Sequence, residues 1–157
     1  MKQTVELQKA QGQMAPGVIT RDGFLGTDSR PLVDILVADD AEVKRLGLTH
    51  ELIARRMSEL RDAGARGLGE YIEVEGGFEV RVESVRGKLP CPFGDVGLFP
   101  KTSISVRSSG HERELVYSDL LIHLIHAHGF YEGKGNPFRL EPREIAEVLD
   151  VKGGGGG

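Results

Sequence analysis

A short segment in the last third of the sequence carries residues that are typical of metal sites. Asp119, His123 and His126 have the spacing i, i+4, i+7, which places them on one strip of a helix. Imidazole and carboxylate groups suit zinc or a similar divalent ion. A fourth ligand must come from elsewhere, and Glu132 is the first candidate, with His111 and Cys91 as alternatives. The predicted metal ligands are Asp119, His123, His126 and Glu132.

Such a site also suggests a reaction. If the ion keeps an open coordination position, it lowers the pKa of bound water, and Glu132 is the candidate base. A metal-dependent hydrolase is therefore one interpretation of this segment. The simpler interpretation of His123 and His126 is a polar strip that faces solvent or a partner.

His128 is predicted to lie apart from the other two histidines. It falls in the middle of the apolar face of the same helix, beside Leu121, Leu124 and Ile125. We expect its ring to pack against the core or to help end the helix before Gly129, and we rank it as the least suitable ligand.

The loop that follows, residues 129–139, combines glycines with cations. Gly133 and Gly135 give a permissive backbone, and successive N–H groups of such a loop can bind an anion. The predicted ligand-binding residues are Lys134, Asn136 and Arg139. The loop is not a P-loop, because Lys134 is not followed by Ser or Thr. Its simpler interpretation is an ordered connection anchored by aromatic residues.

Cys91 is the only cysteine and lies between Pro90 and Pro92. It cannot form an internal disulfide. A nucleophilic role would require a nearby base and a lowered thiol pKa. We expect it to be an inert, small apolar residue.

Residues 45–64, "RLGLTHELIARRMSELRDAG", resemble the turn and second helix of a helix-turn-helix DNA-binding protein. Leu46, Gly47 and Leu48 occupy the turn, and the hairpin that follows resembles a wing. The resemblance implies that exposed residues of the helix over 49–63 enter the major groove. Those residues are His50, Glu51, Ala54, Arg55 and Arg56. The resemblance ends upstream, where Glu42 takes a position that is usually apolar.

Helices and hairpins must position these residues. We expect an irregular arm over 1–31, a short strand over 32–37, a short helix from Asp39 to Gly47 and a longer one from Thr49 to Gly64. Alternating residues predict one hairpin around Gly76–Gly77 and another near 109–110. Residues 87–101 are expected to be irregular, because they are rich in Pro and Gly. Ser118 and Pro142 should begin the last two helices.

This order predicts an α+β fold, in which a mainly antiparallel sheet of two hairpins packs with about four helices. Residues 32–151 form the single domain, and 152–157 are a flexible glycine tail. The chain has 157 residues with a net charge of −4, which argues against a surface devoted to nucleic acid. It has no apolar run long enough for a membrane and no secretory signal, so we expect a cytoplasmic protein.

The favoured function is therefore a cytosolic binding domain. Its ligand would be a small molecule, an anion or a protein partner, and its site the His123/His126 strip with the 129–139 loop. A metal-dependent hydrolase is the first alternative, and a DNA-binding regulator is the second.

Overall fold

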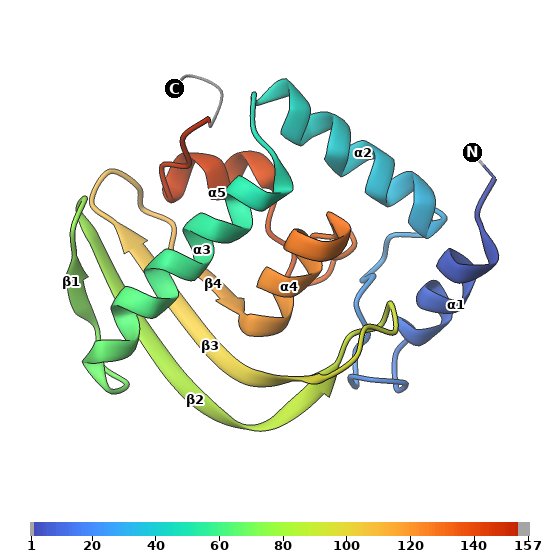
Figure 1. Cartoon of the computed structure of the whole chain (residues 1–157), viewed down its shortest axis with the longest axis horizontal. Helices are drawn as coiled ribbons and strands as arrows, with labels where there is room; N and C mark the ends of the chain where they lie inside the picture. Colours follow the sequence, from blue (N-terminus) through green and yellow to red (C-terminus); the bar gives the residue numbers. More distant parts are fainter. Residues whose placement is uncertain (1, 154–157) are drawn as a thin grey trace.

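The computed structural model, described here for residues 2–153, is an α+β fold built on one antiparallel sheet (Figure 1). Its strands β1 (Ile72–Val74), β2 (Phe78–Pro90), β3 (Leu98–Ser108) and β4 (Leu115–Ser118) are neighbours in chain order. The helices are α1 (Val5–Gln13), α2 (Leu32–Arg45), α3 (His50–Gly64), α4 (Asp119–His128) and α5 (Pro142–Val148), with a 3-10 turn η1 (Ala65–Gly67) after α3. The predicted fold class is confirmed.

The two predicted hairpins are present. Gly76 and Gly77 both have positive φ and connect β1 to β2, and β3 pairs with β4 in antiparallel register. Between them, β2 and β3 form a long ribbon that bends around α4 (Figure 1). The bend coincides with a register shift between Val85 and Lys88, where Gly87 has φ of 112°.

The prediction that residues 87–101 are irregular is wrong in part. They are not irregular throughout, because β2 continues to Pro90 and β3 begins at Leu98. Pro90 and Pro100 fit into the ribbon near its end, where a missing N–H is tolerated. Only the short loop between the two strands is left without regular structure, and it lies beside α4.

The N-terminal half differs from prediction in two places. The arm contains helix α1, and the apolar run at 32–37 is the first part of α2 rather than a strand. Leu32, Ile35 and Val43 face inward with helical spacing. The start of α2 is stabilised by two glutamines, since Gln3 and Gln11 accept hydrogen bonds from the N–H groups of Val33 and Leu32. The predicted glycine tail over 152–157 lies mostly outside the described residues.

Helix α4 lies between two hydrophobic clusters. Leu121 and Ile125 belong to the main core, together with residues of α3, α5 and the sheet. Leu120 and Leu124 belong to a second cluster, which contains Cys91 and also Phe24 of the N-terminal segment, residues 2–31. Each buried apolar side chain contributes about 1.5–3 kcal/mol. Burial on both sides therefore fixes α4 and every residue it presents.

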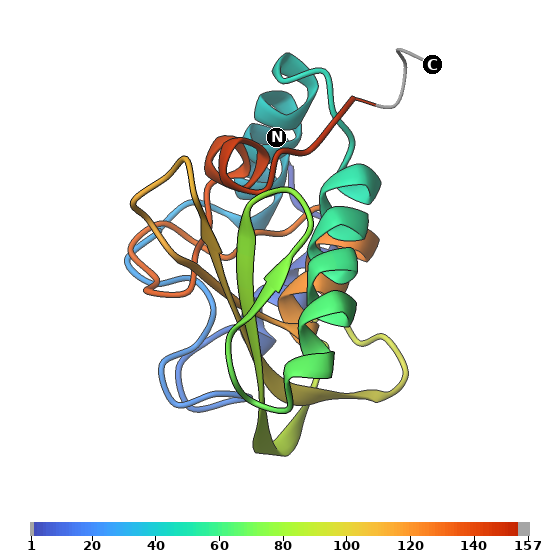
Figure 2. The same cartoon turned by 90° about the vertical axis from the view of Figure 1, so that its left-hand side faces the viewer.

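The N-terminal segment and the loop after α4 lie together. Figure 2 shows the part of the N-terminal segment that follows α1 and the loop after α4 on one side of the sheet, with α3 on the other. Backbone hydrogen bonds join them, since Gly133 N–H donates to Phe24 O and Thr27 N–H donates to Lys134 O. Among residues 2–153, no helix is long and apolar enough to cross a membrane.

Candidate metal centre

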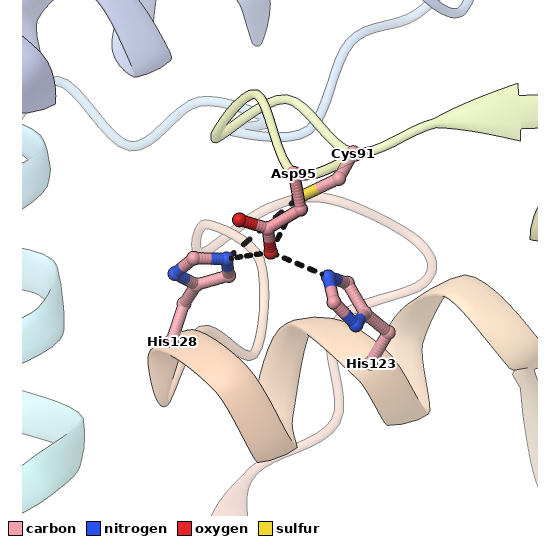
Figure 3. A group of neighbouring side chains, drawn as sticks. All are labelled: Cys91, Asp95, His123 and His128. Carbon is pink, nitrogen blue, oxygen red and sulfur yellow. Dashed lines mark hydrogen bonds and ion pairs between the residues drawn. The ribbon is translucent and has the colours of Figure 1, made fainter. Parts of the chain in front are cut away.

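Four side chains from two parts of the fold meet at the end of the β2–β3 ribbon (Figure 3). Cys91 and Asp95 belong to the loop between these strands, whereas His123 and His128 belong to α4. One donor atom from each lies within 4.8 Å of all the others. We call these four residues the CDHH cluster.

Asp95 lies at the middle of the cluster. Its Oδ2 accepts hydrogen bonds from Nε2 of His123 at 2.7 Å and from Nε2 of His128 at 2.6 Å. Cys91 Sγ lies 3.7 Å from the same oxygen and 3.8 Å from Nε2 of His128. All four donors therefore point to one region of space (Figure 3).

The loop holds Cys91 and Asp95 through its backbone. Gly94 N–H donates to Cys91 O across a tight turn, and Gly94 and Gly97 both have positive φ. Cys91 is buried in the second hydrophobic cluster, while Asp95 is partly exposed. The loop thus presents a buried thiol and an accessible carboxylate in the same direction.

Aromatic rings hold the two imidazoles. Phe99 stacks on His123 with ring centroids 4.3 Å apart, and Phe93 stacks on His128 at 3.9 Å. Ser118 Oγ accepts from Leu121 N–H at the start of α4, and Gly129 ends the helix with φ of 62°. His128 is the last residue of α4, and its Nε2 reaches Asp95 on the loop.

The electrostatics of the cluster suit a cation. Hydrogen bonds from His128 and His123 lower the pKa of Asp95, despite an opposing effect of burial. Burial raises the pKa of the Cys91 thiol against the opposing effect of the Phe93 and Asp95 backbone N–H groups, and the Asp95 carboxylate adds to the rise. A metal ion would reverse that second effect, because a coordinating thiol loses its proton. A thiolate and a carboxylate would together balance a divalent charge.

This group differs from the predicted metal set, of which only His123 belongs to it. Asp119 accepts from Arg61 Nη1 at 2.8 Å, and His126 is exposed. Glu132 is buried on the far side of α4 beside the N-terminal segment. Within residues 2–153, the CDHH cluster is the only group of this kind.

The sequence prediction ranks His128 as the least suitable ligand and names Cys91 only as an alternative fourth ligand. His128 is half-buried and bonded to Asp95, rather than separate from His123 as predicted. Two spacings carried a signal, Cys91-x3-Asp95 in a Pro/Gly loop and His123-x4-His128 at a helix end. Around the axis of α4 these two histidines lie about 140° apart, so a helical wheel assigns them to different faces although both reach the same Asp95 oxygen.

The predicted ligand-binding loop has structural partners. Asn136 Nδ2 donates to Gly23 O at 3.1 Å, and Arg139 is buried in an ion pair with Asp39. Lys134 is exposed, and its backbone N–H donates to Asp28. The loop packs on the N-terminal segment, whereas the His123/His126 strip lines a groove between α3, α4 and the ribbon. The structure does not join the two parts of the predicted site.

The helix that resembles a DNA reader is α3, and its proposed contact residues have mixed surroundings. Ala54 is buried, His50 bonds to Tyr131 and Asp40, and Arg56 Nε donates to Leu149 O. Glu51 and Arg55 remain exposed and pair with each other at 2.9 Å. DNA binding stays a prediction from the sequence.

The fold and the CDHH cluster together define an α+β protein with a four-residue candidate metal centre. Comparisons with protein-family models, curated proteins and solved structures found no match. The cytoplasmic location stays a prediction.

Proposed function

We propose that the protein is a zinc-binding domain whose ion is held by the CDHH cluster. The observation that carries this proposal is the convergence of four donor atoms within 4.8 Å from two segments of the chain. Sulfur, imidazole and carboxylate are together the ligands that zinc prefers.

The donor distances support a tetrahedral ion. Bond lengths of about 2.0–2.3 Å place neighbouring donors about 3.3–3.6 Å apart. The contacts of Cys91 Sγ, at 3.7 and 3.8 Å, are close to this range. The two histidine contacts of Asp95, at 2.7 and 2.6 Å, are hydrogen bonds that must lengthen when the imidazole protons are replaced by an ion.

Four protein donors favour a closed, structural site over an open, catalytic one. Such an ion would attach the β2–β3 loop to α4 and hold the end of the ribbon. The loop also carries Val96, which is fully exposed, so an ion would add to the attachment that buried Cys91 already provides. A metal-dependent hydrolase, the enzymatic alternative, needs one donor to leave and water to enter.

Metal content tests the proposal directly. Protein prepared without a metal-affinity tag, stripped with chelator and titrated with Zn²⁺, should bind one equivalent. At a free zinc concentration near 1,000 times Kd, the ion stabilises the fold by about 4 kcal/mol. For a chain of this size, we expect Tm to rise by about 8–16 °C.

Variants separate the CDHH cluster from the set predicted by sequence. Asp95→Asn and His128→Ala should lose most zinc affinity, whereas His126→Ala, on the same helix, should not. Substitution with Co²⁺ should give a thiolate charge-transfer band that Cys91→Ser removes. Stoichiometric binding that persists in His128→Ala and disappears in His126→Ala would contradict the proposal, as would no binding at all. Zinc-dependent hydrolysis of a p-nitrophenyl ester, abolished in Asp95→Asn, would support the enzymatic alternative.

A further inference from the structure

Glu132 is a buried carboxyl residue without a hydrogen-bonding partner for its side chain among the described residues. Its exposed fraction is 7%, and it lies between buried Tyr131 and Gly133. Its backbone has φ of 71°, which is uncommon for a residue other than glycine. Strained backbone of this kind concentrates at functional sites.

A hydrogen bond explains how the backbone is held in this conformation. Arg139 Nη1 donates to Glu132 O at 2.6 Å, and Gly133 N–H donates to Phe24 O. The main chain on both sides of the carboxyl is therefore fixed, while the carboxyl itself has no such partner.

Glu132 lines a cavity of about 350 Å³ between the N-terminal segment, the sheet and α4. Most of the wall is apolar, with Phe24, Leu120, Leu124 and Val116 among its residues. Three other charged residues line it, Arg21, Asp22 and Lys101, and all three are exposed to solvent. Of the four charged residues that line the cavity, Glu132 is therefore the one that is buried.

An unpaired carboxyl in apolar surroundings is costly to ionise. Burial raises the pKa of Glu132 to about 8, against a smaller opposing effect of Arg139. The Arg139 charge is already matched by Asp39 and Glu141, since each carboxylate accepts two hydrogen bonds from its guanidinium. The Glu132 carboxylate therefore has no counter-ion of its own, and a cation bound in the cavity would supply one.

We propose that this cavity binds a small primary amine with an apolar body, whose ammonium group pairs with the Glu132 carboxylate. The volume is near the lower end of the range for ligand pockets, roughly 300–1,000 Å³, and exceeds that of an engineered cavity of about 150 Å³ that holds benzene. An aromatic ring with a short aminoalkyl chain is the matching size. This site is separate from the CDHH cluster, and its ligand would not contact the zinc ion.

The ion pair makes binding depend on pH. Glu132 must lose a proton when the ammonium enters, so affinity should rise about tenfold per pH unit up to pH near 8. The charged groups that face Glu132 or line the cavity are Arg139, Arg21, Asp22 and Lys101. Arg, Asp and Lys side chains ordinarily titrate outside this interval. A ligand carboxylate would show the opposite trend.

Calorimetric titration with 2-phenylethylamine tests the proposal, with 2-phenylethanol as the neutral probe and 3-phenylpropanoate as the anionic one. We expect the amine to bind at least tenfold more tightly than either, and more tightly at pH 7.5 than at pH 6.5. Glu132→Gln should weaken amine binding at least tenfold, whereas Glu147→Gln, at an exposed glutamate, should leave it unchanged.

A cavity-filling variant gives a second test. Val116 is 40% exposed on β4, so Val116→Phe should fold and should weaken amine binding by narrowing the cavity. The proposal is overturned by equal amine affinity in the parent protein and Glu132→Gln, by tighter binding of 3-phenylpropanoate, or by no amine binding at millimolar concentration.

Discussion

Arg139→Met removes the centre of a buried ionic network and should strongly destabilise the fold. The guanidinium is 5% exposed and donates to both carboxylate oxygens of Asp39, at 2.8 and 3.0 Å, as well as to Glu141. Although burial alone would lower the pKa of Arg139, these hydrogen bonds raise it above its usual value. The arginine therefore remains charged, and its loss leaves the Asp39 carboxylate buried and unpaired.

The expected cost follows from this burial. Removing one partner of a buried ion pair costs about 3–5 kcal/mol. Since the total stability of a domain is about 5–15 kcal/mol, the variant should lose a large share of it. With a shift of about 2–4 °C per kcal/mol, Tm should fall by about 6–20 °C. Urea denaturation of both proteins measures the free energy of unfolding.

Two controls isolate the ion pair. Arg143→Met removes an exposed pair with Glu42, and surface pairs contribute only about 0–1 kcal/mol. The double variant Asp39→Leu/Arg139→Met should recover part of the loss, because it leaves no unpaired charge at Asp39. A loss under about 1 kcal/mol in Arg139→Met, together with lower affinity for phosphate, would refute this reasoning and restore the predicted anion-binding role of Arg139.

Two further predictions concern the same loop. Since the folded pKa of Glu132, about 8, exceeds its ordinary value of 4.5, the folded state holds the proton more tightly and stability should fall as pH rises between these values. From about pH 5 to pH 7.5 the loss is about 3 kcal/mol, and urea denaturation of Glu132→Gln should show a flatter pH dependence. Gly133→Ala should cost about 1–3 kcal/mol in the same assay, because its Cβ would lie 2.2 Å from Leu25 O. Gly12 lies in α1, outside this loop, and a Cβ added there would meet open space, so Gly12→Ala should instead add about 0.5–1 kcal/mol. Stability lost in Gly12→Ala and gained in Gly133→Ala would contradict this account of the packing.

Local signals predicted most of the secondary structure. Three of these signals are the Ser118 cap, Pro142 at a first helical position and the Gly76–Gly77 turn. Each acts on backbone a few residues away, so a short stretch of sequence is enough to predict the element. The strand predicted for the apolar run at 32–37 is wrong, because the run is too short to show a helical period and its helical partner positions lie further along the chain. Its first N–H groups are satisfied by Gln3 and Gln11, which are about 20–30 residues away.

The candidate metal centre was less accessible to sequence reasoning. His123 was identified from its helix, but its partners lie on a loop about 30 residues earlier, and only the bend of β2–β3 brings them together. His128 lies about 140° from His123 around the same helix, and the two rings converge only because Asp95 of the loop lies within reach of both. Both features depend on how distant segments pack in the folded protein, which a local sequence pattern does not encode.

Helix α4 connects the two proposed sites through its packing. Its Leu120 and Leu124 line the cavity of Glu132, while His123 and His128 leave the same helix toward the β2–β3 loop. Cys91 of that loop packs in the same hydrophobic cluster as Leu120 and Leu124. Zinc at the CDHH cluster should therefore stiffen one wall of the cavity without contacting its ligand. Zinc should therefore change the entropy of amine binding. The loss of affinity caused by Glu132→Gln should be the same with and without zinc, because the ion pair itself is unchanged.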